Sequence, residues 1–301
     1  MNPSNKKPDF FIIGAAKAGT TSLYDILSQH TQVYFPFDKE PAYFCDDEYF
    51  SRGDEWYLKT FFGKAREQQI CGEATSRYLY FAEKVAPRIH YYSQPELPKF
   101  IAIFRDPAKL VYSFYWNSVR EGHETLSFKE ALVAERDRMV KLQPQLERRG
   151  QILYAYSRVG LYAQQVLRYL AMFPKDRFLF LLTDDLMDFP TLVSRLQIFL
   201  GLEDLSTFIK PVKSNVSALP ENSKLQKWLR NRSLLKEFLK PFIPLSIRYK
   251  LKMSTLEMNL REFTPPEMDE EIANSIREHY KEETKQLQDI IQRDLSSWLQ
   301  R

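Results

Sequence analysis

The sequence predicts an α/β fold in three layers, with a central parallel sheet and helices on both of its faces. Short apolar runs of the kind that fill buried parallel strands occur at residues 10–13, 99–104 and 177–182, with a fourth candidate at 69–72. Patterns with helical spacing separate these runs, at residues 20–29, 108–121, 127–147 and 161–172. Because strands that alternate with helices are typical of crossover units, this order predicts a parallel sheet covered on both faces.

The C-terminal part of the chain carries helical rather than strand-like patterns. The apolar strand-like runs stop after Gly201. Thr264 and Pro265 have the residue types of an N-cap and a first helical position, so a helix is predicted from there to about Arg293.

One basic segment stands out in this part. Residues 221–252 contain nine Lys or Arg and two acidic residues, a pattern typical either of a solvated helical face or of a contact with an anionic acceptor or a membrane surface. The chain shows no internal repeat. We therefore expect a single domain over residues 1–301, in which residues 221–301 form a helical C-terminal extension.

The composition is that of a globular protein and excludes several classes of function. The 301 residues are 44% hydrophobic and 27% charged, and a net charge of +4 is too small to indicate nucleic-acid binding, although it is compatible with a local basic pocket. Cys45 and Cys71 have the spacing of neither a zinc site nor a disulfide framework, which predicts a reducing compartment.

The N-terminus lacks the apolar region of a signal peptide, and the first apolar run is too short to cross a membrane. We therefore expect no transmembrane segment and a location in a bacterial cytoplasm, unless the chain is a catalytic domain taken from a longer protein. The sequence leaves a homodimer open.

A glycine-bearing loop follows the first predicted strand and opens the first predicted helix. Gly14 and Gly19 permit tight turning, so that successive backbone N–H groups and the positive end of the helix converge on one spot that suits an anion. An ATP-binding loop of the form G-x-x-x-x-G-K-[ST] would carry a lysine where Thr20 stands. The lysine of this loop, Lys17, instead precedes the second glycine by two positions.

This loop resembles the K-x-G-[ST]-[ST] element of sulfotransferases that use 3′-phosphoadenosine 5′-phosphosulfate (PAPS), in particular the heparan-sulfate type and its bacterial relatives. The resemblance implies a P-loop-like fold, in which Lys17 contacts the bridging oxygen of the donor and neutralises the leaving group. It also implies that the 5′-phosphosulfate is held by Lys17, Ala18, Gly19, Thr20, Thr21 and Ser22.

A second segment of the same resemblance follows the strand predicted at residues 99–104. Arg105 begins an Arg-Asp-Pro sequence, and Ser113 follows eight positions later, as in the family's R-[DN]-P…S pattern, whose arginine and serine grip the 3′-phosphate. A guanidinium fork and a hydroxyl suit a phosphate. The resemblance covers residues 8–220. Its candidates for a third loop over the 3′-phosphate side are Lys213 and Asn215.

Glu40 is the candidate catalytic base. Lys39 and Glu40 begin a segment that resembles the family's K-E-x-H-F-F element, whose glutamate deprotonates the acceptor. A hydroxyl that attacks sulfur must lose its proton, so a carboxylate near the donor is chemically sensible. The alternatives are that Glu40 is a loop carboxylate paired with Lys39, and that Glu73 is the base.

Three positions depart from the family's pattern and leave the acceptor open. Ala42 stands where a histidine often occurs, Ala74 replaces a lysine of some members, and Asn117 stands where N-sulfating members carry a histidine. None of these positions belongs to the donor grip.

The sequence therefore predicts a sulfotransferase that moves a sulfuryl group from PAPS to a hydroxyl or amine of a carbohydrate or small-molecule natural product, with PAP (3′-phosphoadenosine 5′-phosphate) as the second product. The expected mechanism is an in-line displacement that needs no metal ion, with Glu40 as base and Lys17 on the leaving group. The alternatives are an ATP-dependent P-loop phosphotransferase and a non-catalytic nucleotide- or glycan-binding module.

Overall fold

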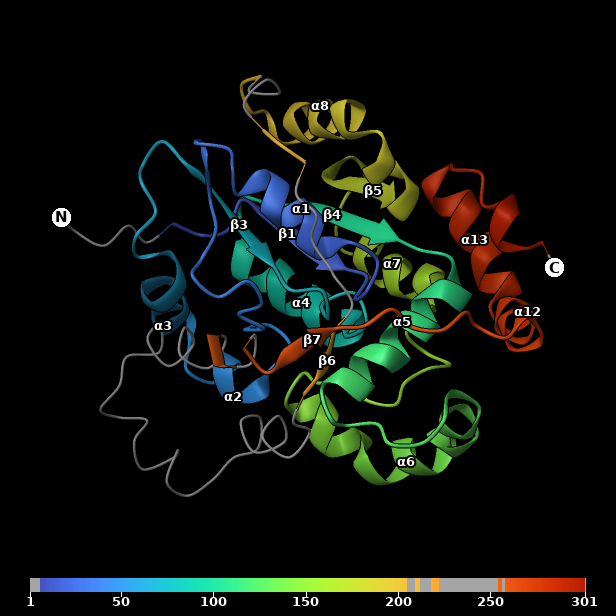
Figure 1. The fold of residues 1–301 in the computed structure, drawn as a ribbon. Helices are drawn as coiled ribbons and strands as arrows, with labels where there is room; N and C mark the ends of the chain where they lie inside the picture. Colours follow the sequence, from blue (N-terminus) through green and yellow to red (C-terminus); the bar gives the residue numbers. More distant parts are fainter. Residues whose placement is uncertain (1–5, 205–208, 212–217, 222–253, 256–257, 301) are drawn as a thin grey trace.

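A computed structural model describes residues 6–204, 209–211, 218–221, 254–255 and 258–300. Its centre is a five-stranded sheet of order β2-β3-β1-β4-β5 in which every neighbouring pair is parallel (Figure 1). The strands are β1 (Phe10–Gly14), β2 (Val33–Tyr34), β3 (Ile70–Ala74), β4 (Lys99–Phe104) and β5 (Phe178–Leu182).

Helices connect and cover these strands. Between the strands of the sheet lie α1 (Thr20–Leu27), α2 (Asp47–Phe50), α3 (Asp54–Tyr57), α4 (Ala82–Ser93), α5 (Pro107–Arg120), α6 (Phe128–Arg148) and α7 (Tyr162–Leu170). After β5 come α8 (Phe189–Leu200), α12 (Glu270–His279) and α13 (Lys281–Ile291). Short π or 3₁₀ turns occupy Leu58–Phe62, Lys175–Arg177, Thr183–Met187 and Ser296–Trp298.

The strand order divides the helices between the two faces of the sheet. The crossover from β1 to β2 runs toward one edge, and the crossovers from β3 to β4 and from β4 to β5 run toward the other. Because such crossovers are right-handed, α1 covers one face while α4 and α7 cover the opposite face (Figure 1). The predicted three-layer α/β fold with a central parallel sheet is therefore confirmed.

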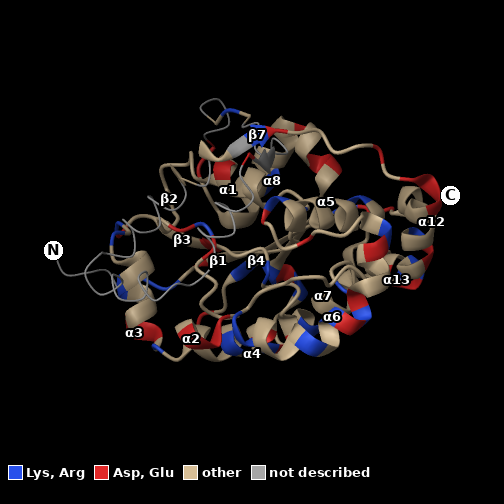
Figure 2. Cartoon of the chain, turned by 60° about the horizontal axis from the view of Figure 1, so that its bottom comes forward, with Lys and Arg blue, Asp and Glu red and all other residues tan. Residues whose placement is uncertain are grey.

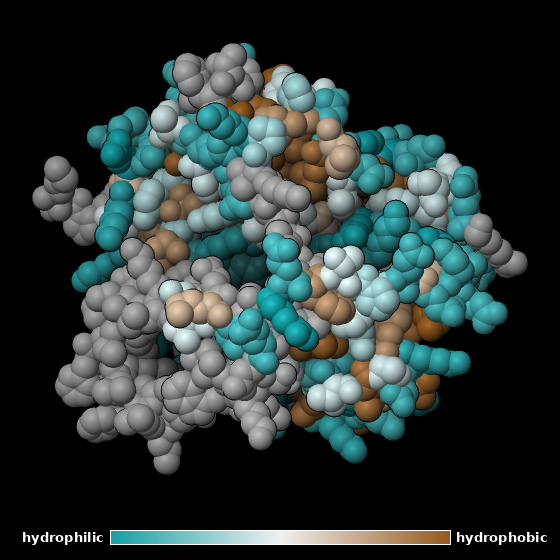
Figure 3. Space-filling view, in the orientation of Figure 1, coloured by the Kyte–Doolittle hydropathy of each residue, from teal (hydrophilic) through white to brown (hydrophobic). Residues whose placement is uncertain are grey.

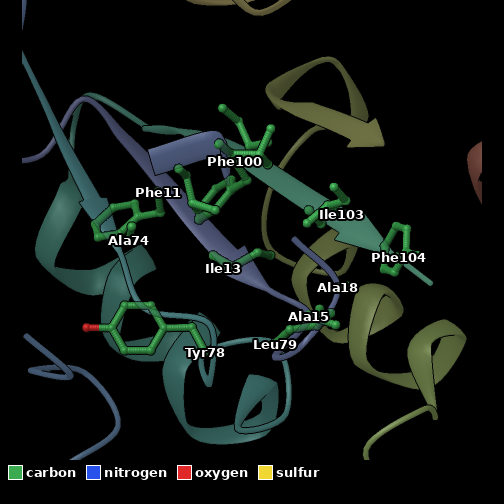
Figure 4. Close-up of a cluster of buried hydrophobic side chains, with 14 of the residues drawn as sticks. Phe11, Ile13, Ala15, Ala18, Ala74, Tyr78, Leu79, Phe100, Ile103 and Phe104 are labelled. Carbon is green, nitrogen blue, oxygen red and sulfur yellow. The ribbon is translucent and has the colours of Figure 1, made fainter. Parts of the chain in front are cut away.

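The core is built from the apolar runs that predicted the strands. All five residues of β1 are buried, because β3 and β4 flank this strand and helices cover both of its faces. Phe11 and Ile13 of β1 lie with Phe100, Ile103 and Phe104 of β4 in one hydrophobic cluster (Figure 4). The strands predicted at 10–13, 69–72, 99–104 and 177–182 are all present, within one or two residues at their ends.

The C-terminal helix prediction is wrong in its start and its continuity. Residues 264–269 form neither helix nor strand, and α12 begins at Glu270. Its N-cap is Asp269, whose Oδ1 accepts hydrogen bonds from the backbone amides of the second and third residues after it, at 2.9 and 3.1 Å. The cause is Pro266, because a proline disfavours helical geometry in the residue before it, here Pro265. The helix is also divided at Tyr280, whose fully buried hydroxyl donates to the carbonyl of Tyr156.

The C-terminal part also contains strands that the sequence did not indicate. β6 (Ala218–Pro220) and β7 (Leu260–Glu262) form an antiparallel pair. Tyr280, Leu287 and Trp298 belong to the same hydrophobic cluster as the sheet. The single domain over residues 1–301 stays a prediction, because most of the basic segment 221–252 lies outside the described residues.

Gly72 offers a test of how tightly β1 and β3 pack. It pairs with Phe10 across the two strands, and a Cβ at position 72 would collide with the Phe10 ring and lie 2.7 Å from Cε1 of Phe35. We expect Gly72→Ala to lower the free energy of unfolding by about 1–3 kcal/mol, as overpacking typically does. Urea denaturation measures this change. In the double variant Gly72→Ala with Phe10→Leu, the loss in free energy of unfolding should be smaller than the sum of the losses in the two single variants. Strict additivity would contradict the packing argument.

Candidate functional site

A pocket of about 1130 Å³ opens at the carboxyl edge of the sheet. Because all five strands are parallel, the segments that follow them emerge at this edge, where α/β folds place their ligands. The pocket is lined by residues 16–22 after β1, Ser76 and Arg77 after β3, Arg105 after β4 and Thr183 after β5. On the face shown in Figure 1, the space-filling view shows a hollow lined by hydrophilic residues (Figure 3).

The loop after β1 is held in place from two neighbouring strand ends. The hydroxyl of Thr183 donates to the carbonyl of Ala18 at 2.7 Å, and Arg105 donates through Nη1 to the carbonyl of Lys17 at 3.2 Å. Gly19 caps α1 with φ 117°, and a Cβ there would lie 2.7 Å from Leu186 Cδ1. These contacts fix the loop so that the first turn of α1, which carries no acidic residue, faces the pocket.

Arg105 and Ser113 line the same pocket as this loop. The backbone carbonyl of Arg105 accepts a hydrogen bond from the hydroxyl of Tyr162 at 3.1 Å, which fixes the chain where β4 ends. Burial lowers the pKa of the Arg105 guanidinium from its usual value. The structure therefore brings together the loop and the Arg105–Ser113 pair in one pocket, and their role in binding stays a prediction.

Lys17 lies among other cations. Burial and then the charges of Arg120, Arg105 and Lys39 lower the pKa of Lys17 to about 8, and Glu40 opposes this shift. Nζ of Lys17 donates to Oδ1 of Asn117 at 3.3 Å. A buried cation with cations around it favours an anionic ligand, because the ligand would relieve their mutual repulsion.

Glu40 faces the pocket in an ion-paired arrangement. Ser76 donates to its Oε1 at 2.6 Å, Arg77 Nε lies 3.4 Å from its Oε2, and Lys39 Nζ lies 3.6 Å from its Oε1. Burial opposes ionisation of Glu40, but the two cations and the Ser76 hydroxyl outweigh burial and lower the pKa of Glu40 below its usual value. Glu40 is therefore ionised at neutral pH, and its partners include Lys39.

Comparisons with known proteins agree with this geometry. Residues 7–288 match the family described as "Sulfotransferase domain". The chain belongs to this family.

Relatives of this sulfotransferase chain include curated proteins and a solved structure. Human heparan sulfate glucosamine 3-O-sulfotransferase 6 is 30% identical over 208 residues, which are 66% of this chain and 54% of that protein. The membrane-associated sulfotransferase kil1 of Dictyostelium discoideum is 35% identical over 115 residues, 38% of this chain and 23% of that protein. The chain spans about half the length of the heparan sulfate 3-O-sulfotransferases that it matches.

A sulfotransferase from Alicyclobacillus acidocaldarius resembles the fold over nearly its whole length. The TM-score is 0.70 at 27% identity, and the match covers 98% of this chain and 100% of that one. This likeness and the strand order 2-3-1-4-5 assign the sulfotransferase chain a P-loop-like α/β fold.

Several pocket residues of the sulfotransferase chain were not singled out by the sequence. Ser76 and Arg77 hold Glu40, and Arg120 donates through Nη2 to Oδ1 of Asn117 at 2.7 Å, the same oxygen that Lys17 contacts. The position of Ser76 and Arg77 directly after the strand predicted at 69–72 could have indicated them, because the carboxyl ends of parallel strands meet at one edge.

The sequence also did not indicate the aromatic wall, a group of three aromatic residues on one side of the pocket. Tyr112 and Trp116 on α5 and Phe263 from the C-terminal segment line the pocket. The rings of Trp116 and Phe263 lie 4.9 Å apart, and the hydroxyl of Tyr112 donates to the carbonyl of Pro266 at 2.9 Å. Their spacing on α5 resembles that of ordinary core residues, so the sequence held no distinct signal for them.

The remaining candidates from the sequence are Lys213, Asn215 and Glu73. Lys213 and Asn215 lie outside the described residues. Glu73, the alternative base, is fully buried and is not among the described residues that line the pocket.

Charged groups and metal-ligating side chains also occur elsewhere among the described residues. Basic and acidic positions are interspersed along the helices (Figure 2). Within the described part of the chain, no group of three or more His, Cys, Asp or Glu side chains could hold a metal ion, and no helix has the length and apolarity to cross a membrane.

The cation cluster makes a prediction about Lys17. We expect its pKa, measured by NMR after ¹³C reductive methylation of the free protein, to be about 8. Arg120→Gln should raise this pKa, because it removes the charge that repels Lys17 most strongly. Arg52→Gln, which removes a cation that contacts Trp56 instead, is the control and should leave it unchanged. A Lys17 pKa above 10 in the protein without substitutions would contradict the proposed effect of burial and of the neighbouring cations.

Proposed function

We propose that this chain transfers a sulfuryl group from PAPS to a hydroxyl or amine of a carbohydrate or small-molecule natural product. One observation carries the proposal. A single pocket joins the loop of Lys17, the Arg105–Ser113 pair and the carboxylate of Glu40, three groups that are far apart in the sequence.

The donor set of the pocket fits PAPS, which supplies the transferable sulfuryl group. Lys17 and the amides of the loop that ends at Ser22 would hold the 5′-phosphosulfate, and Arg105 with Ser113 would hold the 3′-phosphate. The lowered pKa of Lys17 supports this assignment, because burial and then the neighbouring cations disfavour its charge, and an anionic ligand would stabilise that charge. In this arrangement the ammonium of Lys17 stabilises negative charge on the oxygen that leaves with PAP.

Glu40 would accept the proton of the attacking hydroxyl or amine. Ser76 and Arg77 hold its carboxylate toward the pocket, and its lowered pKa keeps it ionised through the neutral range. An ionised and oriented carboxylate is what a general base requires. Glu73 is a poorer candidate for this role, because its carboxylate is enclosed by Tyr57 and Thr75.

The acceptor side would be formed by the aromatic wall. Tyr112, Trp116 and Phe263 present ring faces and edges that suit the apolar face of a sugar or of a small natural product. The alanine at position 42 removes the histidine that resembling enzymes often carry. We therefore propose the acceptor only as a class.

Arg105→Ala tests the 3′-phosphate site. A lost charge-assisted hydrogen bond costs about 1.5–3 kcal/mol, so we expect PAP affinity to fall about 10- to 100-fold. The affinity for AMP should fall less, because AMP lacks the 3′-phosphate and is affected only through the loop that Arg105 helps to hold. Isothermal titration calorimetry with both nucleotides gives the ratio. Arg177→Ala, which removes an arginine at the amino end of β5, is the control. An unchanged preference for PAP in Arg105→Ala would remove Arg105 from the site.

Turnover of PAPS with a panel of acceptors, followed by mass spectrometry, tests the reaction itself. Glu40→Gln should lower kcat by about 10²–10⁴-fold and leave PAP affinity nearly unchanged, because the side chain acts on the acceptor proton. Lys17→Ala should lose about 10²–10³-fold in kcat and also bind PAPS more weakly. Glu55→Gln, on the exposed side of α3, is the matched control. Thermal stabilisation by ATP with Mg²⁺ but not by PAP would instead support a phosphotransferase.

A further inference from the structure

The segment that carries Glu40 has no helix or strand of its own to fix it. Its backbone is attached instead to two hydroxyl groups that follow β3. The amide of Ala42 donates to Oγ1 of Thr75 at 3.3 Å, and the amide of Phe44 donates to the hydroxyl of Tyr78 at 3.1 Å. The position of Glu40 therefore depends on where these two hydroxyls point.

Glu73, the last but one residue of β3, determines that direction. Thr75 donates to its Oε1 at 2.8 Å, Tyr57 donates to its Oε2, and Tyr78 also bonds its carboxylate. Each hydroxyl has one proton. Because the protons of Thr75 and Tyr78 point at Glu73, their oxygen lone pairs face the amides of Ala42 and Phe44.

We propose that Glu73 is a positioning residue: its carboxylate orients the hydroxyls of Thr75 and Tyr78 to accept the backbone amides of the Glu40 segment, and so places Glu40. This inference rests on the proposed function, in which Glu40 is the base. Glu73 itself touches no substrate, because it is fully buried behind the segment.

A proton on Glu73 would disturb this arrangement. The neutral carboxyl brings an additional donor into a site where Tyr57, Thr75 and Tyr78 already donate. One hydroxyl must then turn its proton away, and on the side of the loop it meets backbone N–H groups, which are donors as well. Glu40 should then lose its alignment although it remains ionised.

The surroundings of Glu73 allow this proton to bind in the physiological range. Burial raises the pKa of Glu73 to about 7, against the three hydroxyls that lower it, and the charge of Asp38 raises it further. The other titratable groups that act on Glu73 or face it stay neutral there, because burial raises their own pKa values: they are Tyr57, Tyr78, Tyr92, Tyr169 and Cys45.

The pH dependence of kcat tests the proposal in the intact chain. We expect kcat of the unmodified protein to fall as the pH drops through about 7, whereas protonation of Glu40 would act only below its own lowered pKa. Glu73→Gln should be slower by about 100-fold, the scale of an ångström misplacement, and should lack this transition. Tyr57→Phe should move the transition to higher pH, because the Tyr57 hydrogen bond lowers the pKa of Glu73. Tyr34→Phe, whose hydroxyl donates to the carbonyl of Phe61, is the matched control and should not move it.

Hydrogen exchange provides a readout that does not need turnover. The protection factors of the Ala42 and Phe44 amides, corrected for intrinsic exchange, should fall between pH 8 and pH 6 in the unmodified protein. They should be low at both pH values in Glu73→Gln. If Glu73→Gln does not fold, the shift of the pH transition in Tyr57→Phe tests the role of Glu73.

The outcomes separate the two proposals. Absence of sulfuryl transfer at every pH, with the exchange transition intact, would refute the proposed function but support the role of Glu73 in placing the segment. Turnover with a transition that persists in Glu73→Gln, or that Tyr57→Phe leaves unmoved, would overturn the role of Glu73. A profile that is flat from pH 8 to pH 6 would overturn it too.

Discussion

The central position of β1, between β3 and β4 in an all-parallel sheet, is the constraint on which the pocket depends. It places the loop of Lys17 between the ends of two neighbouring strands. One of them is followed by Arg105, which donates to the carbonyl of Lys17, and the other leads into Ser76 and Arg77, which hold Glu40. An insertion or deletion within β1 would therefore shift the donor loop relative to the groups that follow both neighbouring strands.

Lys17 and Glu40 have different electrostatic surroundings in the pocket. Lys17 is buried among cations, and burial and then their charges lower its pKa. Glu40 is surrounded by Lys39, Arg77 and Ser76, and its charge is already stabilised. The site is thus prepared electrostatically for a negatively charged ligand next to a carboxylate that is ionised at neutral pH.

The sequence predicted the parts of the fold and site whose signal is local. The long apolar run of β4 and the loop after β1 could be predicted from neighbouring residues alone. β2, with only Val33 and Tyr34, is too short to leave a pattern, and α12 starts late because Pro266 follows a proline. The contacts of Glu40 with Ser76 and Arg77 join residues that are 36 and 37 positions apart, so only the register of the sheet reveals them.

The burial of Glu73 limits which substitutions this chain tolerates. A neutral residue at position 73 would relieve the cost of burying a carboxylate, yet it would leave the hydroxyls of Tyr57, Thr75 and Tyr78 without their shared acceptor. Substitutions at these four positions should therefore be strongly epistatic, and each alone should be worse than the set replaced together. A library that varies the four positions jointly would reach stable variants that single substitutions never do.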